Sequence, residues 1–111
     1  MPYFLFAGSY TPESLSSLVQ NPEDRSVYIK SILMNLGGKL EGFYLAFGEY
    51  DFYVIGQLPD TQTAAAFAMS ACAGGGVHNF RTIPLLTWPE GMNAMQQAGR
   101  AGYRPPGAAR K

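Results

Sequence analysis

Side chains able to transfer protons near neutral pH are scarce in this sequence. His78 is the single histidine, and the ordinary pKa of its imidazole lies close to neutrality. Asp51 is the second candidate, because a carboxylate at a rigid hairpin can act as a general base. These two residues are the catalytic candidates. The alternatives are a histidine hydrogen-bonded at the start of a strand and an aspartate that accepts backbone amides in a turn, beside a Gly48 that can take a positive φ.

Tyrosines supply most of the candidate ligand-binding groups. In a regular strand Tyr44 shares a face with Leu40, Gly42 and Ala46, which leave room for a ligand or a closely packed helix. The alternative is that each tyrosine packs in the core with one hydroxyl hydrogen bond. The predicted ligand-binding residues are Tyr10, Tyr44, Tyr50, Asp51 and His78.

The direction of His78 decides which neighbours can assist it. In a regular strand it shares a face with Phe80 and Thr82, and Arg81 projects from the opposite face. The regular pattern therefore gives His78 no charged partner on its own strand.

Metal and cofactor sites are not expected. One cysteine and one histidine exclude a Cys/His zinc site within one chain. The glycine run at residues 74–76 follows a predicted helix and lacks the lysine and hydroxyl of a phosphate-binding loop. We therefore expect no metal and no cofactor.

The composition indicates one domain with more apolar surface than its charges can cover. Of the 111 residues, 47% are hydrophobic and 14% are charged, against about 25% charged in an average protein. We expect a domain at residues 1–98 and a flexible basic tail at residues 99–111. The tail holds four of the eight basic residues: Arg100, Arg104, Arg110 and Lys111. Four spaced charges are a weak nucleic-acid signal, so no nucleic-acid partner is expected. We see neither a signal peptide nor a membrane span, which favours the cytoplasm.

The hydrophobic pattern predicts the order strand, helix, strand, strand, helix, strand, with a further helix at the end. Strands are expected at residues 3–10, 39–47, 51–58 and 77–87. The first helix follows Thr11, breaks and restarts at residues 21–24 and ends at Gly37. The second follows Asp60 and stops at Gly74, and a weaker one covers residues 89–98. The order is typical of an α+β, ferredoxin-like fold, with a four-stranded antiparallel sheet covered by helices on one face. Pro84 places the last strand at an edge or a bulge.

The predicted strands are apolar on both faces. An antiparallel sheet with one face in water shows clean alternation, and these strands do not. Helices cover one face, so something else must cover the other. Two sheets packed face to face in a homodimer are the simplest arrangement.

Several segments resemble the GYD family, whose short name matches Gly48, Tyr50 and Asp51. The matching pieces are residues 8–13, 21–25, 36–44 and 47–51, within a resemblance that covers roughly residues 3–95. The resemblance implies a dimeric α/β barrel, as in small cofactor-free monooxygenases, muconolactone isomerases and ligand-sensing regulator domains. It implies no catalytic residues and no settled activity.

Three functions fit these features. The first is a homodimer that binds a small apolar or aromatic metabolite between sheet and helices, with cofactor-free catalysis by His78 or Asp51 left open. The second is a non-catalytic ligand-sensing or assembly module of the same fold. The third is a purely structural dimer. The fold alone does not choose among them.

Overall fold

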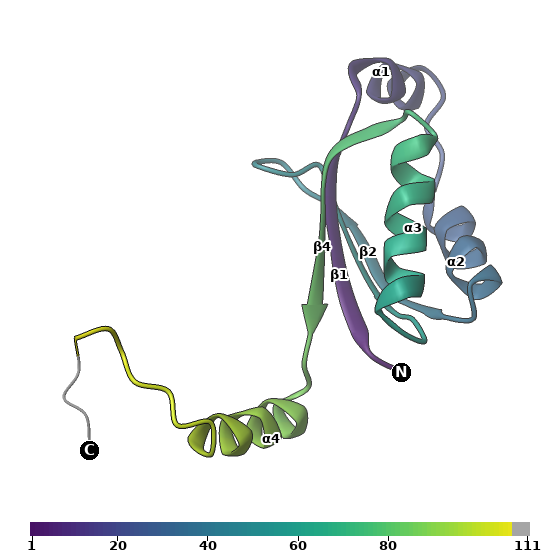
Figure 1. Cartoon of the computed structure of the whole chain (residues 1–111). Coiled ribbons are helices and arrows are strands. Elements are labelled where there is room, and N and C mark those ends of the chain that lie inside the picture. The colour runs from purple at the N-terminus through teal and green to yellow at the C-terminus, as the bar shows by residue number, and fades with distance from the viewer. Residues whose placement is uncertain (108–111) are drawn as a thin grey trace.

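A computed structural model describes residues 1–107 (Figure 1). The elements in chain order are β1 (Tyr3–Tyr10), α1 (Pro12–Gln20), α2 (Ser26–Asn35), β2 (Lys39–Leu45), β3 (Phe52–Gln57), α3 (Thr61–Ala73), β4 (Val77–Leu85) and α4 (Trp88–Gly99). The strands form one antiparallel sheet in the order β2-β3-β1-β4. The predicted α+β, ferredoxin-like fold is confirmed. Strands β2 and β4 each end two residues earlier than predicted, and the tail residues Arg110 and Lys111 lie outside the described part.

The predicted helix boundaries rest on side-chain caps and one glycine. The Thr11 hydroxyl accepts a hydrogen bond from Ser14 N at 3.3 Å, and the Asp60 carboxylate accepts one from Thr63 N at 2.8 Å. Each cap satisfies a backbone amide that the first helical turn leaves free. After α2, Gly37 takes a φ of 81°, a left-handed conformation that favours glycine. These local signals fix where the chain enters and leaves the sheet.

The core lies between the sheet and helices α2 and α3. Figure 1 shows both helices on the same side of the sheet. The buried side chains come from the centre of the sheet, from these helices and from Leu58 just after β3. Phe6 meets Phe67 of α3 edge-on at 4.7 Å between ring centroids. The buried core cluster is Phe4, Phe6, Leu33, Phe52, Val54, Leu58, Ala64 and Phe67.

Two register shifts change which side chains share a face. One lies in β2 between Leu40 and Gly42, and the other lies where β4 pairs with β1 around Asn79, whose φ is 51°. Each shift adds a residue to one strand, so the alternation changes phase there. Leu40 therefore packs toward the helices with Phe43, and the prediction that it shares a face with Tyr44 is wrong.

The second shift corrects the predicted direction of His78. His78 pairs with Ser9 and Arg81 pairs with Ala7, and these β1 partners point to the same face. His78 and Arg81 therefore share the face that no helix covers, whereas Phe80 points to the core. The prediction that His78 lies with Phe80 fails because a bulge cannot be read from simple alternation.

The edge position of β4 is as predicted. It pairs only with β1 in the described chain, and Pro84 lies opposite Phe4. A proline lacks the amide that an inner strand would need for a second neighbour.

Helix α4 extends away from the rest of the chain. Figure 1 shows it beyond the end of β4, on the side of the sheet opposite α2 and α3. None of its residues is buried. The radius of gyration is 18.1 Å, whereas a compact chain of this length would have about 13 Å. The α4 segment is therefore an arm rather than part of the core.

Candidate functional site

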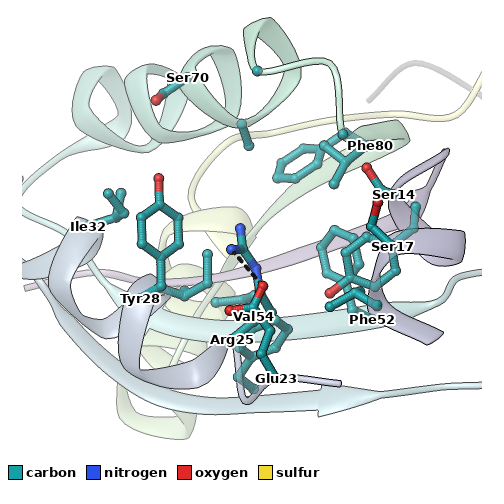
Figure 2. Close-up of a pocket in the computed structure, with 18 of the residues that line it drawn as sticks. Ser14, Ser17, Glu23, Arg25, Tyr28, Ile32, Phe52, Val54, Ser70 and Phe80 are labelled. Carbon is teal, nitrogen blue, oxygen red and sulfur yellow. Dashed lines mark ion pairs between the residues drawn. The ribbon is translucent and has the colours of Figure 1, made fainter. Parts of the chain in front are cut away.

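The main cavity is a cleft on the helix-covered side of the sheet, near the ends of α1, α2 and α3 (Figure 2). Its volume is about 680 Å³, within the usual range of small-molecule sites. A second hollow of about 490 Å³ adjoins it between α1 and the end of β2. The two share Tyr10, Leu18, Glu23, Arg25 and Phe43, so they form one continuous depression, here called the cleft.

Aromatic rings form the floor of the cleft. Phe52 of β3 lies centrally, with ring centroids 5.1 Å from Tyr10, 6.1 Å from Phe43 and 6.2 Å from Phe80. A Cβ atom at Gly8 would lie 2.8 Å from the Phe52 ring and 3.1 Å from the Phe80 ring. Glycine at this position thus lets the rings approach the strand closely. The resulting surface suits a flat apolar ligand.

One cation lies on the wall of the cleft, in the loop before α2. The Arg25 guanidinium is 3.6 Å from the Glu23 carboxylate and 4.6 Å from the centre of the Tyr28 ring. Figure 2 shows Arg25 between Tyr28 on one side and Ser17 and Phe52 on the other. An arginine has five donors, and these contacts leave several of them free for a ligand. Arg25 can therefore bind an acidic group placed above the aromatic floor.

Asp51 joins β1 to the β2–β3 hairpin at the rim of the cleft through two hydrogen bonds. Its Oδ2 accepts a hydrogen bond from Tyr10 N at 3.0 Å, and its own amide donates to Gly8 O at 2.8 Å. The residue therefore extends the pairing of β1 with the β2–β3 hairpin, and its carboxylate takes the place of a backbone carbonyl. The structural alternative for Asp51 was an amide of its own turn, whereas the observed donor is an amide of β1, 41 positions away. Gly48, in the same hairpin, does not have a positive φ.

The environment of Tyr10 differs from that of an exposed tyrosine. Burial raises the pKa of its phenol above the ordinary value, and the Asp51 and Glu23 carboxylates raise it further, although Arg25 acts in the opposite direction. The phenol is therefore a neutral hydrogen-bonding group at physiological pH.

The structure brings only part of the predicted set to the cleft. Tyr10 and Asp51 line it. Tyr44 pairs with Tyr53 on the uncovered face of the sheet, and Tyr50 stacks edge-on against Tyr53 at 5.8 Å. His78 lies on that same face and is exposed. The five predicted residues thus belong to two separate surfaces.

Arg25, Tyr28 and Ser17 are functional candidates that sequence reasoning missed. From the sequence, residues 21–25 indicate a helix restart and a piece of the family resemblance, and neither assigns a role to Arg25. A usable signal was present, since Arg25 and Tyr28 are three residues apart and lie on one side of a helical turn. Whether that side faced the cleft depended on the fold.

The charged side chains that line the cleft are four carboxylates, Glu13, Glu23, Asp24 and Asp51, and one arginine, Arg25. Among the described residues that line it there is no histidine, cysteine or lysine. Asp51 is engaged by Tyr10 N, Glu23 by Arg25, and Asp24 by Ser26 N at 2.9 Å. The carboxylate of Asp51 is therefore already occupied by a structural hydrogen bond.

The uncovered face of the sheet, here called the open face, is a second candidate surface. It is apolar at its centre, where Leu5 and Ile55 pair, and Tyr44 and Ile83 are 62% and 42% exposed. His78 and Arg81 lie toward its β4 edge. Large exposed apolar surfaces are uncommon on monomers and mark interaction sites.

Within residues 1–107, no group of three or more His, Cys, Asp or Glu side chains could hold a metal ion. No helix in this range has the length and apolar character needed to cross a bilayer.

Comparison with known proteins gives one match. The family model described as GYD domain matches residues 4–95, which is most of the chain. No curated protein and no solved structure matches the chain.

Proposed function

The chain belongs to the GYD domain family, and we propose that it binds a small aromatic molecule with an acidic group in the cleft between sheet and helices. The observation that carries the proposal is the combination of an aromatic floor around Phe52 with Arg25 on the wall above it. A planar ring would lie on the floor, and its carboxylate would reach Arg25 in exchange for Glu23. Ligand binding without chemistry is the role that these side chains support best, which favours the ligand-sensing alternative.

A matched pair of probes tests the chemical class. Binding of 1-naphthoic acid and of its neutral amide is measured by calorimetry and thermal shift. We expect the acid to bind more tightly, and a ligand at about 100 times its dissociation constant adds about 2.7 kcal/mol of stability. Arg25→Gln should remove the preference for the acid. Arg81→Gln, the same change on the open face, should leave it intact. Equal binding of acid and amide to the unaltered chain contradicts the acidic class.

A second pair of variants tests the place of binding. Ser17 lines the cleft, whereas its neighbour Ser16 is exposed on α1 and does not. Ser17→Trp should fill the cleft and abolish binding, while Ser16→Trp should bind as the unaltered chain does. Binding that survives Ser17→Trp contradicts the cleft as the site.

We further propose that the protein is a homodimer joined through the open face. The support is the apolar character of that face in a chain with few charges. Because the cleft lies on the other side of the sheet, dimer formation would leave it accessible. Catalysis by His78 is not part of the proposal, and the cytoplasmic location and the basic tail stay predictions.

A further inference from the structure

Helix α4 is a well-defined helix that packs against no other element of the described chain, residues 1–107. Its N-terminus has a complete capping box, in which the Thr87 hydroxyl accepts from Glu90 N at 3.3 Å and the Glu90 carboxylate accepts from Thr87 N at 2.8 Å. Pro89 stands in the first turn, where proline is favoured. The start of the helix is therefore encoded locally and does not depend on packing.

The rest of α4 requires packing for its stability. It has 12 residues, which is marginal for an isolated helix in water, and it contains Gly91. Trp88, Met92 and Met95 recur at spacings of four and three residues, so they lie along one face. They are 78%, 56% and 61% exposed. This apolar stripe has no cover within residues 1–107.

The direction of α4 indicates what covers the stripe. Only Leu86 and Thr87 separate β4 from α4, and the capping box fixes Thr87, so the connection is short and ordered. Figure 1 shows α4 on the side of the open face, and the β2–β3 loop on that same side near the other end of the sheet. Phe47 of that loop is fully exposed, and it also borders the cleft. The open face thus lies between the β2–β3 loop and α4.

From this arrangement we propose that α4 is an arm that packs its Trp88–Met92–Met95 stripe against a second copy of this chain. The inference rests on the proposed homodimer and adds a contact to it. A copy seated on the open face would lie beside α4, and the two-fold symmetry of a dimer would give each chain the partner's arm. The arm enlarges an interface whose sheet-to-sheet part involves short strands.

The charge of α4 distinguishes a protein partner from a membrane. Helices that lie on anionic membranes carry lysine and arginine on their polar face. Glu90 is the only charged residue within α4, the polar side is made of Asn93, Gln96 and Gln97, and the nearest cation is Arg100 at the C-cap. The stripe therefore fits the apolar rim of a second subunit better than a lipid surface.

Trp88 provides a direct test because it is the only tryptophan in the chain. Its emission and its quenching by acrylamide are measured on the full chain over concentrations that span dimer dissociation, together with sedimentation. The monomeric reference is Ile55→Glu, which places a charge on the open face, checked for folding by circular dichroism. We expect the dimer to show emission at shorter wavelength and several-fold weaker quenching than the monomer.

Four other results of the Trp88 experiment would contradict the arm contact. A dimer in which Trp88 is as quenchable as in the monomer overturns the arm contact and leaves the homodimer standing. A monomer with a protected Trp88 shows that α4 folds back on its own chain, which also overturns it. Protection that appears only with vesicles of phosphatidylcholine and phosphatidylglycerol assigns the stripe to lipid. A chain that is monomeric throughout overturns both the dimer and the arm.

A pair of double variants tests the stripe by affinity. Met92→Ala with Met95→Ala removes the apolar side chains and keeps helix propensity, and we expect the dimer dissociation constant to rise by about tenfold or more. Asn93→Ala with Gln97→Ala makes the same change on the opposite side and should alter it by less than about twofold. Equal effects of the two pairs would contradict a contact made by the stripe.

Discussion

Neighbouring residues of β1 point to opposite faces of the sheet and meet different surroundings. Phe6 is fully buried beneath α3, where it contacts Phe67. Leu5 points to the open face and is only partly buried, although its cross-strand partner Ile55 is equally apolar. Both faces therefore have the composition of a protein interior, but the chain closes only one of them. The difference teaches that an apolar sequence alone does not tell whether a sheet face is covered by its own chain, and that the open face is available for contacts with other molecules.

The largest expected effect is a difference in the free energy of unfolding between alanine variants on the two faces of the sheet. Phe6→Ala removes a fully buried ring and should lower the free energy of unfolding by about 3–5 kcal/mol. Leu5→Ala should cost less in a monomer, because its side chain is only half-covered there. Denaturant unfolding at low and high protein concentration measures both. The cost of Leu5→Ala should grow with concentration, and a cost independent of concentration contradicts a role in dimer formation.

A charge on the open face should break the dimer. Ile55→Glu would bury a carboxylate without a partner between the two sheets, at a cost of about 3–5 kcal/mol, which corresponds to a dissociation constant at least about 100-fold higher. Gln62→Glu adds the same charge to the exposed surface of α3 and should leave association unchanged. Sedimentation measures the dimer dissociation constant of both variants. An unchanged dissociation constant for Ile55→Glu would contradict an interface through the open face.

The Phe52 and Phe80 rings approach Gly8 closely, so a larger residue at this position should destabilise the helix-covered side of the sheet. Gly8→Ala places a methyl group against the Phe52 and Phe80 rings, and we expect a loss of about 1–3 kcal/mol together with weaker ligand binding. Gly48→Ala is the control, since nothing lies within 4 Å of the added carbon and φ is not positive. Thermal unfolding and calorimetry compare the two. Similar losses in both variants would contradict the packing described for the cleft floor.

The smallest expected effect is a pH dependence at the cleft. Burial raises the pKa of Tyr10, so the folded state holds this phenol's proton more tightly than the unfolded chain does. The corresponding stability is fully present below the ordinary tyrosine pKa and is lost as the pH rises through the raised value. The difference in tyrosinate absorbance between the unaltered chain and Tyr10→Phe should therefore appear at higher pH in the folded protein than in the same chains unfolded in denaturant. Coincident titrations would contradict the buried environment.

The elements of the fold could be predicted because their signals are local. The caps at Thr11 and Asp60 and the left-handed Gly37 each act within one turn, and the structure places all three as expected. The apolar character of both sheet faces is likewise visible in the strands themselves. The edge position of β4 follows from the missing amide of Pro84.

The site could be predicted only in part. It depends on which sheet face each strand residue points to and on contacts between residues distant in the sequence. The bulge at Asn79 turns His78 to the open face, and a bulge adds one residue without a distinctive sequence signal. Asp51 reaches Tyr10 N across 41 positions of the chain, which no local pattern encodes. Arg25 lines the cleft together with residues of β1, β2 and β3 that are distant from it in the sequence. The direction of α4 was equally invisible, although its capping residues were not.

A second copy of the chain on the open face is the central proposal for this protein. Sedimentation equilibrium of the full chain at micromolar concentration tests it directly. We predict a species of twice the 12.1 kDa chain mass that dissociates on dilution. A single species of 12.1 kDa at every concentration would contradict the claim, and the apolar open face would then need another explanation.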